Sequence, residues 1–258
     1  MRRGRRYRRP LVLILDDEHS WTAITQPAHA WVSAQVARHW GNDDFAPPEP
    51  LEEVVLGIEQ HDIAWADWDL RPPLHPPARR AASFLEVPPV PRLAIWDDAP
   101  RRALAQSPWA ALLVSLHGRN IHTRFGDPSQ LPPDLTALLH AYLERQRGVQ
   151  AELVTALGID EAVAERAGDL LFALDSLSLR ICHGWPAGDL PAVDGAVVTV
   201  TPDGEDAFVL DPWPLRVDRL EVHLTVRTLA ERFDDEAALH AALDAAPWTR
   251  RAWTLHPG

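Results

Sequence analysis

The sequence has no lysine, a single cysteine and no pair of glycines in a G-x-G arrangement. With Cys182 alone, an intrachain disulfide and a paired-cysteine zinc motif are both excluded, and a reducing compartment is favoured. The lack of a G-x-G arrangement argues against a glycine loop that cradles a nucleotide phosphate. The apolar run near the start, residues 11–15, is too short for a signal-peptide core or a membrane span. We therefore expect a cytoplasmic protein without a membrane-spanning segment.

Positive charge is also scarce over most of the chain. All 25 positive side chains are arginines, against 37 Asp and Glu side chains, which gives a formal net charge of −12. Six of the arginines lie in residues 1–10, which we expect to form a flexible tip, so the rest of the chain has a net charge of −18. Such an acidic body repels a phosphate backbone, which excludes nucleic acid as a partner. A small-molecule substrate fits this composition, and a homodimer remains compatible with it.

The composition is otherwise typical of a globular protein, with 46% hydrophobic and 24% charged residues. We expect a single domain over residues 1–258, of class α+β and mainly α. Its predicted parts are an N-terminal hairpin over residues 11–26, a helical core over 27–186 and a small, mainly antiparallel β subdomain over 187–258.

Apolar periodicity and helix-terminal residues place the expected elements. One helix should begin near Pro27 and end before Gly41, and a second should follow Pro50 and continue to Trp65. The proline-rich segment 71–91 predicts an irregular loop. Further helices are expected over 92–106, 108–116, 133–157, 160–183 and 235–245, and strands over 196–201, 207–210, 220–226 and 251–255.

A His-Asp pair occurs on the apolar face of the second expected helix. His61 and Asp62 are flanked by Ile58 one turn before and by Trp65 one turn after. Burying an ionised aspartate costs free energy unless an arginine, a hydrogen-bond network or a metal ion compensates its charge. Asp175 repeats this pattern on a strongly apolar helix, so the same three forms of compensation apply there.

Two histidines complete a candidate set of ligands. His29 lies in the first turn of the first expected helix, and His117 ends an apolar run. Mixed imidazole and carboxylate side chains suit Mn, Fe, Co, Ni, Zn or Mg with little selectivity between them. We therefore predict one or two divalent metal ions, with the following ligands: His29, His61, Asp62, His117 and Asp175.

The order His, His-Asp, Asp on successive helices resembles the HD-domain superfamily of helical metalloproteins. This resemblance implies an HD-like helical core in which a divalent metal is held by His29, His61, Asp62 and Asp175. His117, between the pair and the last aspartate, resembles an additional ligand of the dinuclear members. In those members the aspartate of the pair bridges two metals.

A second resemblance covers more of the chain. Its motifs are residues 24–30 (ITQPAHA), 59–65 (EQHDIAW), 68–69 (WD), 109–117 (WAALLVSLH) and 174–179 (LDSLSL). In sequence and in order they are similar to an uncharacterised bacterial family, the domain of unknown function 3891, over residues 11–215. This resemblance implies no known activity.

The first functional hypothesis is a metal-dependent hydrolase of a small phosphorylated metabolite or nucleotide. The metal would activate a water molecule and polarise a phosphoryl oxygen. His117 would act as a general acid or base, or as a ligand of a second metal, and Arg119 would offset phosphate charge. Trp65 and Asp69, which follow the His-Asp pair, would line the substrate pocket.

Two further hypotheses remain open. One is a di-iron oxygenase on the same scaffold. The other is a non-catalytic binding protein, in which Arg119 and Arg180 neutralise the buried aspartates within a structural His/Asp network. His75 and His122 are weaker candidates that we expect to be exposed, and Cys182 is expected to pack in the core.

Overall fold

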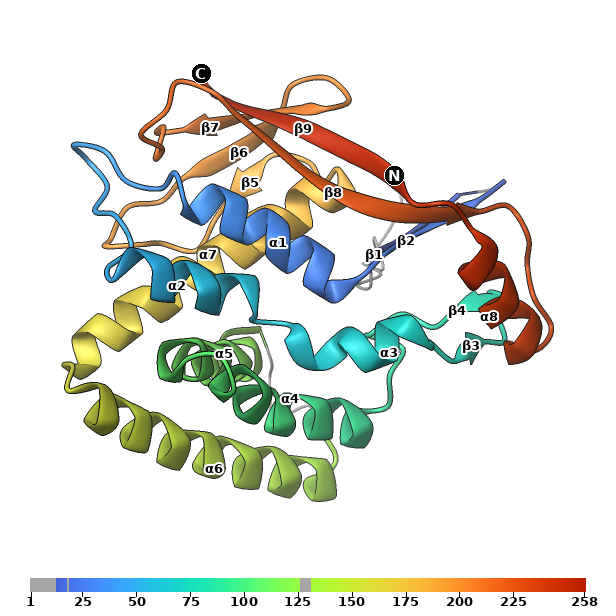
Figure 1. The fold of residues 1–258 in the computed structure, drawn as a ribbon, viewed down its shortest axis with the longest axis horizontal. Coiled ribbons are helices and arrows are strands. Elements are labelled where there is room, and N and C mark those ends of the chain that lie inside the picture. Colours follow the sequence, from blue (N-terminus) through green and yellow to red (C-terminus); the bar gives the residue numbers. More distant parts are fainter. Residues whose placement is uncertain (1–12, 18, 126–130) are drawn as a thin grey trace, which may run out of the picture.

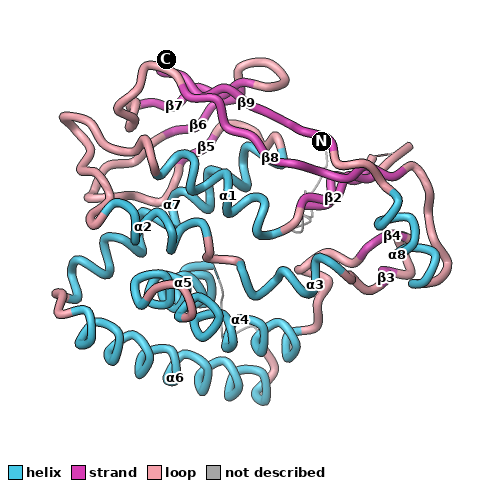
Figure 2. The backbone as a smooth tube through the Cα atoms, in the orientation of Figure 1, coloured by secondary structure: helices cyan, strands magenta, loops and turns pink. Residues whose placement is uncertain are grey.

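The computed structural model describes residues 13–17, 19–125 and 131–258, so the arginine-rich segment 1–10, expected to be a flexible tip, lies outside the described residues. Figure 1 shows a curled sheet along one side of the molecule with helices beneath it. The helices α1 (Gln26–Ala37) and α7 (Glu161–His183) lie next to the sheet, and α6 (Pro133–Leu157) forms the opposite side. The fold is α+β with a large helical part, as the sequence predicts (Figure 2).

One sheet of seven strands has the order β1-β2-β8-β9-β7-β6-β5. Its strands are β1 (Leu13–Asp16), β2 (Trp21–Ile24), β5 (Gly188–Asp189), β6 (Thr199–Pro202), β7 (Ala207–Asp211), β8 (Leu220–Leu229) and β9 (Thr249–Pro257). Neighbours are antiparallel except for β7 and β9, which are parallel. Because β2 pairs with β8, with Trp21 opposite Leu229, the N-terminal hairpin and the C-terminal strands form one continuous sheet.

Most helices lie where the sequence predicts them. The remaining ones are α2 (Leu51–Glu59), α3 (Ala66–Leu70), α4 (Pro89–Leu104), α5 (Pro108–Asn120) and α8 (Glu236–Ala245). The Ser107 hydroxyl accepts the backbone N–H of Trp109 and so caps α5, whereas Gly158 and Gly184 end α6 and α7 at φ 64° and 59°. Over the described ranges, none of these helices is both long and apolar enough to cross a membrane.

The second expected helix is shorter than predicted. It ends at Glu59, and the chain continues through a turn, a 3-10 helix η1 (Ile63–Trp65) and α3. A side-chain bond accounts for the break. Nδ1 of His61 donates to the carbonyl oxygen of Ile58 at 2.8 Å, an acceptor that the backbone N–H of Asp62 would use in a continued helix. The His-Asp pair therefore lies in the turn after α2 and not on a helix face.

The segment 71–91 is more ordered than expected. It contains a two-stranded hairpin of β3 (Leu74–His75) and β4 (Arg80–Ala81), and α4 begins within it at Pro89. The buried Arg80 side chain donates to the carboxylates of Asp16 and Glu86, which ties this hairpin to β1. The prolines of this segment predict irregular structure, but its hairpin is bonded both to a carboxylate within the segment and to one that is distant in the sequence.

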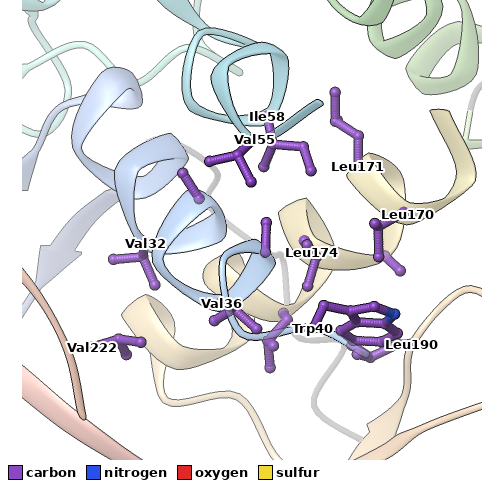
Figure 3. Close-up of a cluster of buried hydrophobic side chains, with 14 of the residues drawn as sticks. Val32, Val36, Trp40, Val55, Ile58, Leu170, Leu171, Leu174, Leu190 and Val222 are labelled. Carbon is purple, nitrogen blue, oxygen red and sulfur yellow. The ribbon is translucent and has the colours of Figure 1, made fainter. Parts of the chain in front are cut away.

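The main hydrophobic core joins the sheet to α1, α2 and α7. Figure 3 shows side chains from these elements, and from the segments that follow α1 and β5, lying together: Val32, Val36, Trp40, Val55, Ile58, Leu170, Leu171, Leu174, Leu190 and Val222. All of them are buried, and α5 adds Leu112, Leu113 and Leu116 to the same cluster. This core fixes the relative positions of the four helices that carry or precede the predicted ligands.

Packing between α5 and α6 depends on Gly118. A Cβ atom at this position would overlap the hydroxyl oxygen of Tyr142, which is buried and without a hydrogen-bond partner among the described residues. We expect Gly118→Ala to lower the free energy of unfolding by about 1–3 kcal/mol, because a packed core absorbs added atoms poorly.

The Tyr142→Phe substitution should restore part of the stability that Gly118→Ala loses. It removes the overlapping hydroxyl and leaves Cζ at 3.5 Å from the added Cβ. By itself it should be neutral or stabilising, since an unpaired buried hydroxyl carries a desolvation penalty. Urea unfolding of the two single variants and of the double variant measures the coupling. A double variant less stable than Gly118→Ala would contradict this account.

Candidate metal centre

Five buried polar side chains converge from four segments of the chain. His29 comes from the first turn of α1, His61 and Asp62 from the turn after α2, His117 from the last turn of α5 and Asp175 from the middle of α7. Each is at most 5% exposed. We call this set the five-residue centre. The structure brings together all five residues that the sequence analysis proposes as ligands.

The orientation of His61 is fixed by the same bond that ends α2. Because Nδ1 donates to Ile58, Nε2 is left facing the carboxylates, 3.6 Å from Oδ2 of Asp62 and 3.6 Å from Oδ1 of Asp175. A histidine that ligates a metal commonly donates its other N–H to a backbone carbonyl in this way, which selects the tautomer and aims the lone pair.

Ser178 orients His29 through a short hydrogen-bond chain. Its hydroxyl donates to the backbone carbonyl of Asp175 at 2.9 Å, so it must accept the proton of His29 Nδ1 at 2.9 Å. Nε2 of His29 then faces Oδ2 of Asp62 at 2.8 Å. Both atoms carry lone pairs when the imidazole is neutral, so a proton or a metal cation must lie between them.

Several atoms of the centre have no hydrogen-bond partner within the described part of the chain. They are Nε2 of His61, Oδ1 of Asp62 and Nδ1 of His117. One ligand atom each from His29, His61 and Asp175 lie within 4.8 Å of one another, and the same holds for His61, Asp62 and His117. Unpaired buried polar atoms are costly, and a cation bound among them would satisfy several at once.

The electrostatics of the centre favour a cation. Burial lowers the pKa of His61, but Asp62 and Asp175 outweigh this effect and raise that pKa to about 9. Burial raises the pKa of Asp62, but His61 and His29 lower it to about 2. Burial and the positive charge of His61 lower the pKa of His117 to about 4. The pKa values of Asp62 and Asp175 are both lowered, so two ionised carboxylates lie in this buried position near neutral pH and attract a cation.

These shifts predict the pH dependence of stability for the metal-free protein. His61 holds its proton up to about pH 9 in the folded state and up to about 6.5 when unfolded, so its stabilisation is complete below pH 6.5 and is lost as the pH rises to 9. His117 acts in the opposite direction, because its neutral form is retained down to about pH 4. We expect the stabilisation that His61 contributes to fall by about 3 kcal/mol between pH 6.5 and pH 9.

Chemical denaturation in the presence of a chelator, from pH 5 to pH 9, checks this expectation. The His61→Asn variant is the control, since it cannot take up this proton. Between pH 6.5 and pH 9 it should lose clearly less stability than the wild type, keeping only the loss that ionisation of Asp69, with its pKa of about 8, causes in both proteins. An equal loss in this variant would show that another group is responsible.

A cavity of about 430 Å³ reaches the centre. His29, Asp62, His117 and Asp175 line it, whereas His61 lies behind them and is completely buried. Cavities of this size hold small molecules. A small ligand can therefore contact four of the five side chains.

Arg119 does not reach this cavity. Its guanidinium donates to both carboxylate oxygens of Glu165, and it lies two residues, or about 200°, around α5 from His117. The expectation that Arg119 offsets substrate charge, or neutralises the buried aspartates, is therefore wrong. Arg180 does line the cavity, where it donates to the backbone carbonyls of Pro186 and Asp189.

Trp65 and Asp69 also lie apart from the cavity. Trp65 is buried in an aromatic cluster, 6.1 Å from Trp96 between ring centroids. Asp69 accepts the backbone N–H of Gln26 at 2.6 Å, and burial raises its pKa to about 8. Asp69 therefore holds the start of α1, Trp65 packs behind Trp96 in the cavity wall, and neither contributes to the lining.

Other residues at the site were not predicted. Ser178 orients His29, and its only signal in the sequence is its position one turn after Asp175. Gln26 and Trp96 line the cavity without any such signal. His122, expected to be exposed, is partly buried and lies 6.5 Å from Trp96 between ring centroids.

Comparison with known proteins gives one match. A family model described as "Protein of unknown function (DUF3891)" matches residues 12–231. No curated protein and no solved structure matches the chain.

Proposed function

The chain belongs to the DUF3891 family, and we propose that it is a divalent-metal-dependent hydrolase of a small phosphorylated metabolite or nucleotide, with an HD-like arrangement of ligands. The observation that carries this proposal is the convergence of three histidines and two aspartates, several with unpaired atoms, in a buried position open to a cavity. The proposed metals are Mn, Fe, Mg, Co, Ni or Zn, as one or two ions.

In this proposal His29, His61, Asp62 and Asp175 hold the metal. When bound, the ion would polarise a phosphoryl oxygen and make a water molecule acidic enough to attack at neutral pH. Its binding would displace the proton of His61, because Nε2 of that ring faces both carboxylates. His117 is neutral at pH 7, and its unpaired Nδ1 can accept a proton or hold a second ion.

The competing interpretation is a structural network neutralised by arginine. The ion pairs of Asp62 and Asp175 are with His29 and His61. Arg119 is paired with Glu165, and Arg180 donates to the backbone carbonyls of Pro186 and Asp189. The distribution of charge therefore supports a cation site better than an arginine-balanced network.

Metal analysis of the full chain, purified without a histidine tag, tests the proposal. We expect one or two equivalents of a divalent metal per chain and metal-dependent release of phosphate from a panel of phosphomonoesters. Metal content far below one ion per chain, after supplementation with each proposed metal, would overturn it.

The same measurement separates the other hypotheses. Two redox-active irons per chain would favour the di-iron oxygenase. A folded protein without metal, whose stability does not change on adding any of these ions, would favour the non-catalytic binding protein.

A further inference from the structure

The cavity above the five-residue centre has mostly apolar walls. They come from the loop after β4, from α4, from the residue that follows α5, from α7 and from the loop between β5 and β6. The main contributors are Phe84, Leu85, Trp96, Ile121, Leu179 and Leu190. Walls of this kind bind the hydrocarbon part of a ligand by removing it from water.

Polar groups in the same lining are few. Outside the five-residue centre they are the side chains of Gln26, Ser176, Arg180 and Asp189. Arg180 is the one cationic side chain among the described residues that line the cavity, and Asp189 adds a negative charge. Gln26 is buried, and its Oε1 has no hydrogen-bond partner within the described ranges.

The small number of polar groups in the lining disfavours a nucleotide as the substrate. A nucleoside phosphate would bring a base and a ribose with many donors and acceptors, and the apolar walls offer few partners for them. Polar groups that leave water without finding partners lower affinity. Several linked phosphates would also need more positive charge than one arginine and one metal site supply.

We propose that the substrate is a phosphomonoester whose other half is apolar, a hydrocarbon chain or an aromatic ring. The phosphoryl end rests on the proposed function, whereas the apolar half rests on the cavity walls alone. Hydrolysis would add water across the P–O bond: the water oxygen bonds to phosphorus, the ester P–O bond breaks, and the leaving oxygen takes a proton. The products are inorganic phosphate and an apolar alcohol or phenol.

Calorimetric titration with straight-chain alkylphosphonates, from methyl to octyl, tests this inference because these compounds resist hydrolysis. The dissociation constant should fall about fourfold for each added methylene until the cavity is full. Hexylphosphonate should bind more tightly than adenosine monophosphate. Affinity independent of chain length, or tighter binding of the nucleotide, would overturn the inference.

Substitutions in the apolar walls test whether the dependence of affinity on chain length arises in this cavity. Leu179→Asn should reduce the dependence on chain length and leave the affinity for methylphosphonate unchanged. Leu85→Asn offers the same test at a more exposed position, 38% exposed, where folding is less at risk. Leu138→Asn on α6 is the matched control, since Leu138 is 45% exposed and does not line the cavity. Unchanged chain-length dependence in both wall variants would count against the inference.

Repeating the series after chelation separates the two proposals. If the metal proposal fails, chelation should leave the affinity for every phosphonate unchanged, and each methylene should still increase affinity. If the apolar inference fails, the increment per methylene should be absent whether or not metal is bound.

Discussion

The Asp62→Asn protein should lose at least about 100-fold of its affinity for divalent metal and remain folded. Oδ2 of Asp62 lies 2.8 Å from Nε2 of His29 and 3.6 Å from Nε2 of His61, so this carboxylate is central to the five-residue centre. Asparagine keeps the shape but removes one of the two negative charges. Its amide N–H can donate to His29, which explains why the metal-free fold should survive.

Thermal unfolding with and without added metal measures this loss, because a ligand that binds only the folded state raises the melting temperature. Asp67→Asn is the matched control, five residues away, with a side chain that is 73% exposed and paired with Arg102. His61→Ala and the exposed His140→Ala form a second pair of the same design. Wild-type affinity in Asp62→Asn, or an equal loss in Asp67→Asn, would contradict the assignment.

All five members of the centre could be predicted because each interrupts an apolar pattern. Asp175, for example, is enclosed by leucines along α7, where an uncompensated charge has no favourable environment. The sequence analysis expects Arg119 and Asp69 at the substrate cavity, but neither lines it, for the opposite reason. Their neighbours in the sequence suggested the site, but their side-chain directions depend on partners, Glu165 and the Gln26 backbone, that are distant in the sequence.

Prediction of the fold from the sequence is limited in the same way, because it too depends on partners that are distant in the sequence. Local alternation predicts β8, but β8 pairs with β2, about 200 positions away in the sequence, and the pattern of neither strand identifies the other as its neighbour. The end of α2 at Glu59 was missed because no proline or helix-ending glycine marks it. The break comes from the ring of His61, which takes the carbonyl of Ile58. The hydrogen bond from His61 to Ile58, which the sequence pattern does not predict, is therefore also the bond that orients Nε2 toward the centre.

The contact between α2 and α5 leads to the last prediction. A Cβ atom at Gly57 would overlap Cδ1 of Leu113 and lie 2.9 Å from its Cβ, and Leu113 is completely buried. A leucine Cβ cannot move without its helix, so Gly57→Ala should lower the free energy of unfolding by about 2–3 kcal/mol. Gly148→Ala on α6 is the matched control: its added Cβ has no atom within 4 Å, and it should stabilise the protein by about 0.5–1 kcal/mol.

The metal affinity of the Gly57→Ala variant provides a second test of this helix contact. His61 and Asp62 follow α2, and His117 lies on α5, so any separation of these two helices also separates ligand atoms that now lie within 4.8 Å. We expect Gly57→Ala to bind metal more weakly than the wild type and Gly148→Ala to bind it equally well. Stability and metal affinity both unchanged in Gly57→Ala would show that α2 can shift freely. The close approach of the two helices at Gly57 would then not hold the centre together.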